Sequence, residues 1–193
     1  MKAEKTQNEL MLACAAQQGD KEAIRLLLTR NWTWLRGLVY GVLGHGQDLD
    51  DVLQDICLRV ITKVHTLREP ERFRGWLAIL ARREALKHYR RRAQQGIELD
   101  GCVAVRPTQA YEQMPPEAAE KKELCERILD AAQRLPAKYR EVFMLAHAGG
   151  LTYAEMAEVL DVPVTTMQIR LVRARRMIQN QVLHAAADKV KQR

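Results

Sequence analysis

Long apolar runs are missing from this chain of 193 residues. No segment approaches the roughly 20 uninterrupted apolar residues that a membrane-spanning helix needs. The first nine residues, MKAEKTQNE, are polar and lack the apolar block of a signal peptide. With 28% charged and 47% hydrophobic residues, the composition is typical of a globular protein and not of a disordered one. We therefore expect a cytoplasmic protein without membrane insertion, built as one ordinary domain or two small ones.

Clustered cysteines are also missing. The four cysteines, at 14, 57, 102 and 125, are far apart and form no CxxC pair. A structural zinc site needs neighbouring thiolate or imidazole ligands, and a disulfide scaffold is unusual inside a cell. Three of the four fall in helical patterns, where we expect them to act as small buried hydrophobic side chains. The sequence thus predicts no metal site and no cofactor.

Motifs of common enzyme classes do not occur either. The sequence contains no GxGxxG, no GxxxxGK[ST] and no HExxH. Its five histidines are scattered, and none is paired with a serine or cysteine in a recognisable catalytic arrangement. We therefore expect a protein that is not an enzyme and has no catalytic residues.

Positive charge is abundant but unevenly distributed along the chain, whose net charge is +7. Residues 1–92 carry 17 Lys and Arg against 11 Asp and Glu, and residues 117–193 carry 13 against 10. Residues 93–116 reverse the balance, with 1 against 3. Two basic segments joined by an acidic one favour two modules that face nucleic acid. A basic surface that is merely solvated is the alternative, which charge alone leaves open.

Helical periodicity dominates both basic segments. Apolar residues repeat about every 3.6 positions over 24–42 and again over 49–64, and a third helix is expected from Phe73. Residues 93–116 lose this period and contain glycine and proline, as linkers do. The period returns in 117–183, with Leu124 and Leu135 in one apolar stripe, and 184–193 is expected to be a tail. No strand-like alternation appears, so we predict an all-α fold of two small helical domains, 8–92 and 117–183, on a flexible linker.

Residues 152–178 follow the pattern of a helix-turn-helix. Thr152 and Glu155 predict a capping box, and a turn at 161–163 leads into a second amphipathic helix. Polar and basic side chains mark the outer face of that helix: Thr166, Gln168, Arg170, Arg173 and Arg176. Arginine suits guanine edges and phosphates, and glutamine suits adenine. This pattern predicts duplex DNA binding, with a basic helical hairpin that binds no ligand as the alternative.

A second basic face lies on the helix that begins near Phe73. Arg83, Lys87, Arg90 and Arg91 fall on one side, with Trp76 and Tyr89 nearby in the sequence. Aromatic rings beside positive charge suit unstacked bases, through stacking and phosphate neutralisation. The alternative is that Trp76 belongs to the core and the arginines are only solvated.

An acidic cluster, Asp48-Leu-Asp-Asp-Val-Leu-Gln-Asp55, opens the second helix. No histidine stands in ligand spacing to it, and aspartates near a helix N-terminus also have a reason in the helix dipole. In a basic protein, we interpret this acidic face as a docking surface for a basic partner.

These three features occur in a fixed order in one family, and the chain resembles bacterial sigma-70-family RNA polymerase sigma factors of the extracytoplasmic-function (ECF) type. The segment 50–58, DDVLQDICL, resembles the core-binding motif of the family, and FRGWL at 73–77 with the later RRR run at 90–92 resembles its −10 segment. LPAKYREV at 135–142, GLTYAEMA at 150–157 and RLVRAR at 170–175 resemble its −35 domain. The resemblance covers 8–92, sigma region 2, and 117–183, sigma region 4.

The resemblance implies a transcription initiation subunit whose partners are core RNA polymerase, promoter DNA and an anti-sigma factor. It implies contacts with core polymerase from Asp50, Asp51, Gln54 and Asp55. It implies contacts with −10 DNA from Arg68, Phe73, Arg74, Trp76, Arg83, Lys87, Tyr89, Arg90 and Arg91, and capture of a flipped base by the loop 67–72. It implies contacts with −35 DNA from Thr152, Thr165, Thr166, Gln168, Arg170, Arg173 and Arg176.

Two departures from the family pattern fall in the turn of the helix-turn-helix. Asp161 stands where the family usually has glycine, and Pro163 stands where it usually has a capping serine. Aspartate tolerates a left-handed turn and proline suits a helix start, so the motif is expected to survive without a transferable base preference. A stand-alone helix-turn-helix regulator and a DNA-acting enzyme that uses the acidic cluster remain the alternatives. The first would usually be a dimer, yet no coiled-coil heptad is present.

Overall fold

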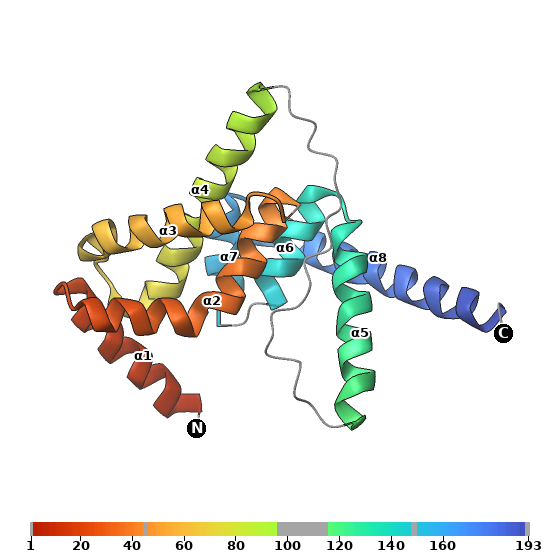
Figure 1. Ribbon diagram of the computed structural model, residues 1–193, viewed down its shortest axis with the longest axis horizontal. Coiled ribbons are helices and arrows are strands. Elements are labelled where there is room, and N and C mark those ends of the chain that lie inside the picture. The colour runs from red at the N-terminus through yellow and green to blue at the C-terminus, as the bar shows by residue number, and fades with distance from the viewer. Residues whose placement is uncertain (1, 45, 96–115, 148–149, 192–193) are drawn as a thin grey trace.

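The computed structural model describes residues 2–44, 46–95, 116–147 and 150–191, and these form α-helices and short 3₁₀-helices (η) without a strand (Figure 1). The elements are α1 (Lys2–Gln17), α2 (Lys21–Leu43), α3 (Leu49–Lys63), η1 (Val64–Thr66), η2 (Pro70–Arg72), α4 (Phe73–Gln94), α5 (Pro116–Gln133), α6 (Ala137–His147), α7 (Tyr153–Leu160) and α8 (Val164–Lys191). The predicted all-α fold is confirmed. Within this part of the chain, no helix is long and apolar enough to span a membrane.

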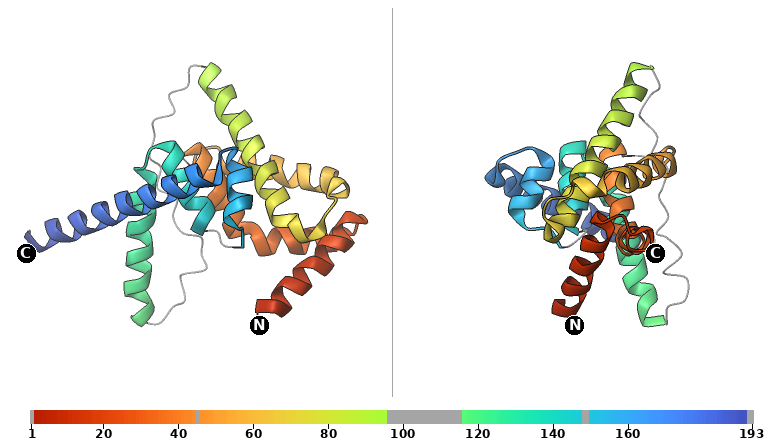
Figure 2. Two further views of the ribbon diagram at one scale, coloured as in Figure 1. Left: turned by 180° about the vertical axis from the view of Figure 1, so that it is seen from behind. Right: turned by 90° about the vertical axis from the view of Figure 1, so that its left-hand side faces the viewer.

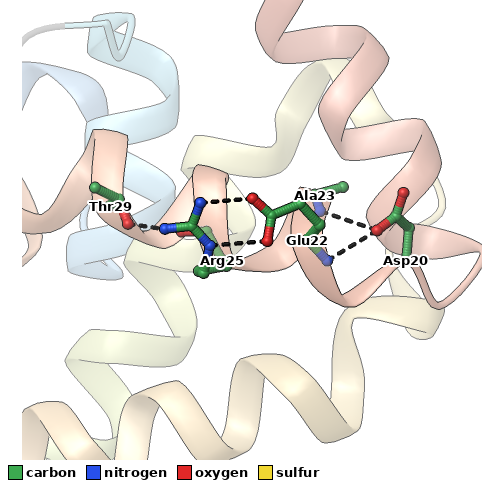
Figure 3. Close-up of polar contacts among 5 residues, drawn as sticks. All are labelled: Asp20, Glu22, Ala23, Arg25 and Thr29. Atoms are coloured by element: carbon green, nitrogen blue, oxygen red, sulfur yellow. Dashed lines mark hydrogen bonds and ion pairs between the residues drawn. The ribbon is translucent and has the colours of Figure 1, made fainter.

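An N-terminal unit of α1 to α4 is organised around α2, against which α1, α3 and α4 all pack. The start of α2 is fixed by Asp20, whose carboxylate accepts the backbone N–H groups of Glu22 at 2.8 Å and Ala23 at 3.1 Å (Figure 3). One turn on, Arg25 donates from Nε to Glu22 at 2.8 Å, and this hydrogen bond lowers the pKa of the Glu22 carboxyl. The helix ends at Gly44, whose φ of 78° is one that glycine adopts without strain.

The apolar stripes predicted for α2 and α3 form the core of this unit. They are buried: Ile24, Leu27, Leu28, Leu35, Leu38 and Val42 on α2, and Leu49, Val52, Leu53, Ile56 and Val60 on α3. The stripe on α4 is buried at Leu77, Ala81 and Ala85, whereas Leu80 is half-buried. Helical spacing therefore identified the inward faces correctly.

A C-terminal unit of α5 to α8 contains the predicted helix-turn-helix. The hydroxyl of Thr152 accepts the Glu155 N–H at 3.2 Å, and the Glu155 carboxylate accepts the Thr152 N–H at 2.7 Å, which completes the capping box. Asp161 ends α7 with a φ of 55°, so it takes the left-handed conformation where the family usually has glycine. The inward residues of α8 are buried as predicted: Met167, Leu171, Ala174 and Ile178.

Some predictions need correction. Leu124 is 49% exposed, because α5 packs against the rest of its unit mainly through its last turns, where Ala131 and Ala132 are buried. Cys125 is also exposed and is not a core residue, whereas Cys14 and Cys57 are partly buried. The predicted tail at 184–193 begins inside α8, which continues without a break to Lys191. Most of the predicted linker, from 96 to 115, and Cys102 with it, lie outside the described residues.

The two units pack against each other, a contact that the sequence did not predict. Helix α6 lies along α2, and α7 lies against α4 (Figure 2). Two ion pairs join the units: Arg82 of α4 binds Glu141 of α6, and Arg72 of η2 binds Glu158 of α7 at 2.5 Å. The C-terminal half of α4 and the end of α8 project from this body in different directions (Figure 1).

Candidate nucleic-acid interface

The outer face of α8 borders a groove whose other wall is the first turn of α6. The groove has a volume of about 160 Å³ and is lined by Lys138, Tyr139, Thr166, Ile169, Arg170 and Arg173. Three of these six side chains are cationic and none is acidic. Because the helix-turn-helix fixes how α8 stands against α6 and α7, this positive groove has a defined shape that suits a polyanion.

Three of the predicted −35 residues, Thr166, Arg170 and Arg173, meet in this groove. Thr165 and Arg176 are exposed on the same outer side of α8. Gln168 is exposed too, but it follows Thr166 by two positions, which places it about 200° around the helix and away from the groove. Thr152 uses its hydroxyl in the capping box, so its side chain supports the fold of the motif.

Three further residues of the groove, Lys138, Tyr139 and Ile169, were not predicted as contacts. The Lys138 ammonium lies 5.1 Å from the centre of the Tyr139 ring. Lys138 and Tyr139 belong to the segment LPAKYREV, which resembles part of the −35 domain of the family. However, nothing in the linear sequence indicates that the start of α6 faces α8 across a groove.

The basic face of α4 is exposed along the part of the helix that leaves the body. Arg83, Lys87, Arg90 and Arg91 are all accessible, and Tyr89 is half-buried beside them. Only Lys87 among these four cations has an ion pair with a described residue, a long one of 3.9 Å to Glu84. A projecting helix with this many cations on one side offers a surface for a nucleic-acid backbone.

Two residues predicted to contact the −10 element, Phe73 and Arg74, point into the unit in this structure. Phe73 is 1% exposed, because it begins α4 and packs into the core next to Trp76, with ring centroids 6.1 Å apart. Arg74 turns inward: its Nε donates to the buried Asn31 at 2.9 Å, and its guanidinium lies 5.7 Å from the centre of the Trp34 ring. Both residues therefore shape the unit from inside.

The loop before α4 is held by both units. The Leu67 carbonyl accepts a hydrogen bond from Gln17 of α1, while the neighbouring Arg68 is exposed. A cavity of about 190 Å³ lies beside the loop, lined by Glu9, Leu10, Pro70, Glu71, Phe73, Arg74, Gly150 and Glu155. Gly150 and Glu155 belong to the C-terminal unit, which thus closes one side of the cavity.

The acidic helix α3 presents a second kind of surface. Asp50, Asp51, Gln54 and Asp55 are all exposed, as predicted for a docking face. Asp50 is paired with Arg36 at 2.6 Å, whereas Asp51 and Asp55 have no ion pair with the other described residues. Leu58 and Ile61, which continue this face, are 56% and 52% exposed.

Asp48 differs from its acidic neighbours. Its carboxylate forms an ion pair with Arg92 of α4, and both side chains are mostly buried. This pair fixes the start of α3 against α4. Among the described residues, no group of three or more His, Cys, Asp or Glu side chains is arranged to hold a metal ion.

A projecting basic helix and a helix-turn-helix with a cationic groove define a nucleic-acid-binding protein of two helical units. Two family models match these same units: "Sigma-70 region 2" over residues 27–95 and "Sigma-70, region 4" over residues 125–178. The chain therefore belongs to the sigma-70 family of transcription initiation factors, and its relatives place it among the ECF sigma factors.

Those relatives match over most of their length. The ECF RNA polymerase sigma-E factor of Haemophilus influenzae is 26% identical over 174 residues, which covers 86% of this chain and 90% of the relative. The ECF RNA polymerase sigma factor SigW of Bacillus subtilis is 25% identical over 173 residues and covers 86% and 92%.

Solved structures share the arrangement of helices. CnrH, solved in complex with the cytosolic domain of CnrY, has a TM-score of 0.61 at 25% identity and covers 92% of this chain and 97% of the other. The sigma factor RpoE of Bartonella quintana, solved with the anti-sigma factor NepR, has a TM-score of 0.66 at 21% identity, over 82% and 95%. The second similarity supports the fold alone.

Proposed function

We propose that this chain is an ECF sigma factor that binds core RNA polymerase and directs it to promoters with a −10 and a −35 element. The proposal rests on one observation: the charged surfaces described above fall within the two sigma-70 regions that the chain matches. The region 2 match contains the acidic face of α3 and the basic face of α4, and the region 4 match contains every residue that lines the cationic groove. Each of these three surfaces is assigned one partner: core polymerase for α3, −10 DNA for α4 and −35 DNA for the groove.

The exposed face of α3 is the proposed docking site for core polymerase. Asp51 and Asp55 offer two carboxylates, and Gln54 lies beside Asp51 on the exposed side. Asp50 contributes at the edge, where its carboxylate is highly accessible although it pairs with the less exposed Arg36. Charged side chains beside the exposed Leu58 and Ile61 suit a partner helix that is both basic and apolar.

The two DNA elements are proposed to bind at opposite units. The −10 strand lies along the exposed side of α4, where Arg83, Lys87, Arg90 and Arg91 neutralise phosphates and Trp76 and Tyr89 offer ring faces. Arg68 lies at the loop that captures a base.

The −35 duplex lies in the groove beside α8, held by Thr166, Arg170 and Arg173, with Thr165 and Arg176 at its border. We assign no promoter contact to Phe73, Arg74 or Gln168, and Thr152 only supports the motif.

Regulation by an anti-sigma factor is part of the proposal. It is supported by CnrH, which is 25% identical to this chain and was solved in complex with a second protein, the cytosolic domain of CnrY. We propose that the chain acts in the cytoplasm, where core polymerase is found, and that it has no catalytic activity of its own.

Run-off transcription tests the function directly. The full chain is added to purified bacterial core polymerase, genomic fragments of the source organism serve as templates, and the 5′ ends of the transcripts are sequenced. Initiation at a common pair of elements that depends on both proteins supports the proposal. Binding of duplex DNA without core polymerase, and no initiation with it, would instead identify a stand-alone regulator. Metal-dependent change of the DNA itself would identify an enzyme.

A further inference from the structure

Tyr139 lines the cationic groove. It is held in the first turn of α6, where its backbone N–H donates to the Pro136 carbonyl at 2.8 Å. Its side chain is half-buried and faces the outer side of α8. A tyrosine side chain has few rotatable bonds, so it loses little conformational freedom when it is ordered. It can therefore orient the longer side chains around it.

Tyr139 and Arg173 line the same groove from its two walls. A side-chain hydrogen bond with the Arg173 guanidinium is the largest cause of a pKa of Tyr139 below its ordinary value of 10.0. The nearby charges of Lys138, Arg173 and Arg170 lower this pKa further. The phenol therefore lies near three cations.

The ring of Tyr139 has a second contact, with Lys138. The ammonium lies 5.1 Å from the ring centre, within the range of a cation–π interaction. Arginine and lysine side chains lose much rotamer freedom when they bind, and this loss weakens binding unless they are ordered beforehand. One aromatic side chain thus restrains two cations that line the same groove.

We propose that Tyr139 is a positioning residue for −35 recognition, which holds Arg173 and Lys138 so that the groove receives a backbone phosphate of the duplex. The inference rests on the proposed function and deepens it. A phosphodiester is favoured over a neutral ligand because all charged side chains that line the groove are cationic. Phosphate contacts fix the register of a protein on DNA, so Tyr139 would set how α8 meets the base edges.

The test uses holoenzyme reconstituted from core polymerase and the full chain, on a promoter identified by run-off transcription. Tyr139→Phe removes only the hydroxyl, and we expect roughly three- to tenfold weaker promoter binding, the size of one hydrogen bond. The slope of log affinity against log salt should stay the same, because no cation is lost. Arg173→Ala and Lys138→Ala should each reduce that slope by about one phosphate contact.

A double variant separates positioning from a general loss of structure. In an Arg173→Ala background, Tyr139→Phe should have little further effect, because the group that it orients is gone. Additive losses, or a Tyr139→Phe holoenzyme that binds like the parent, would overturn the proposal. Arg134→Ala, an exposed arginine of the same unit outside the groove, is the charge-matched control and should bind as the parent does.

A second readout does not depend on transcription. The tyrosine side chains of the full chain can be titrated by NMR after ring labelling, with Tyr139→Phe to assign the signal. Tyr139 should ionise below its ordinary range, and Arg173→Ala should raise its pKa. An unshifted pKa that ignores Arg173 would refute the contact. If the parent holoenzyme initiates at no promoter, the proposed function fails. The role of Tyr139 in −35 binding then fails too, even when the titration finds the contact between Tyr139 and Arg173.

Discussion

Arg140 of α6 donates a hydrogen bond from its Nε to the backbone carbonyl of Gly41 in α2, at 3.1 Å. This bond joins two positions 99 residues apart and belongs to the contact between the units. Around it, Met144 of α6 packs onto Gly37 and Gly41, one helical turn apart on α2. The absence of side chains at both glycines lets the two helices approach closely. Region 4 is thereby held against region 2 in the free chain.

Gly41→Leu should separate the two units. A Cβ atom at this position would lie 3.0 Å from the Cβ of Met144, which is tighter than ordinary packing, and a leucine adds more bulk. Overpacking of this kind costs typically about 1–3 kcal/mol, which the contact between the units can avoid by opening. Small-angle X-ray scattering of the full chain should therefore show a larger radius of gyration than the parent has.

Gly75→Ala is the matched control, since Gly75 is also a buried glycine within a helix. Its added Cβ would lie 3.8 Å from the Glu155 carboxylate, an ordinary contact. The scattering of this variant should match that of the parent. If Gly41→Leu also leaves the scattering unchanged, the close approach of α2 and α6 is not what holds the units together.

The Arg82–Glu141 pair should contribute more to this contact than the Arg72–Glu158 pair. Arg82 and Glu141 are 20% and 17% exposed, so removal of either leaves a poorly hydrated charge. We expect a coupling energy of roughly 1–3 kcal/mol from a double-mutant cycle of Arg82→Met and Glu141→Ala, measured by urea unfolding of the full chain. The accessible Arg72–Glu158 pair should give about 0–1 kcal/mol in the parallel cycle. Equal couplings would contradict this ranking.

Local features of the fold could be predicted because their causes lie within a few residues. The spacing of Leu49, Val52 and Ile56 identifies the buried side of α3 by helical geometry alone. The capping box of Thr152 and Glu155 spans three positions, and the left-handed turn at Asp161 follows from the tolerance of aspartate for that conformation. These predictions needed no knowledge of tertiary contacts.

Contacts between distant segments could not be predicted in the same way. Phe73 and Arg74 look like surface residues of a basic motif, but the buried Asn31 and the Trp34 ring that receive Arg74 are about 40 residues earlier. Tyr139 faces Arg173 only because the helix-turn-helix folds α8 back along α6. A single sequence contains no period or spacing that links such pairs.

Thr152→Ala should destabilise the helix-turn-helix by about 1 kcal/mol, the usual cost of a lost N-cap. The hydroxyl of Thr152 accepts the Glu155 N–H, so alanine leaves that donor without its partner. Thr152→Ser keeps the oxygen and should retain most of the stability and of the promoter binding. Thermal unfolding of both variants, with promoter binding measured well below the transition, checks this. Weak binding by a stable Thr152→Ser variant would instead indicate that the threonine methyl group contacts DNA.

Asp51→Ala combined with Asp55→Ala should abolish binding to core polymerase and leave the fold intact. Both carboxylates are exposed on α3 and have no ion pair with the other described residues, so the free energy of unfolding should change by only about ±0.5 kcal/mol for each. Loss of contacts that become desolvated in a complex costs roughly 2–5 kcal/mol of binding free energy.

Asp48→Ala is the matched comparison from the same acidic segment. It breaks the mostly buried pair with Arg92, so its melting temperature should fall. A thermal melt and a core-polymerase pull-down of both variants distinguish the two roles. A normal pull-down with the double variant would refute docking through α3, and a collapsed melt would show that Asp51 and Asp55 stabilise the helix as Asp48 does.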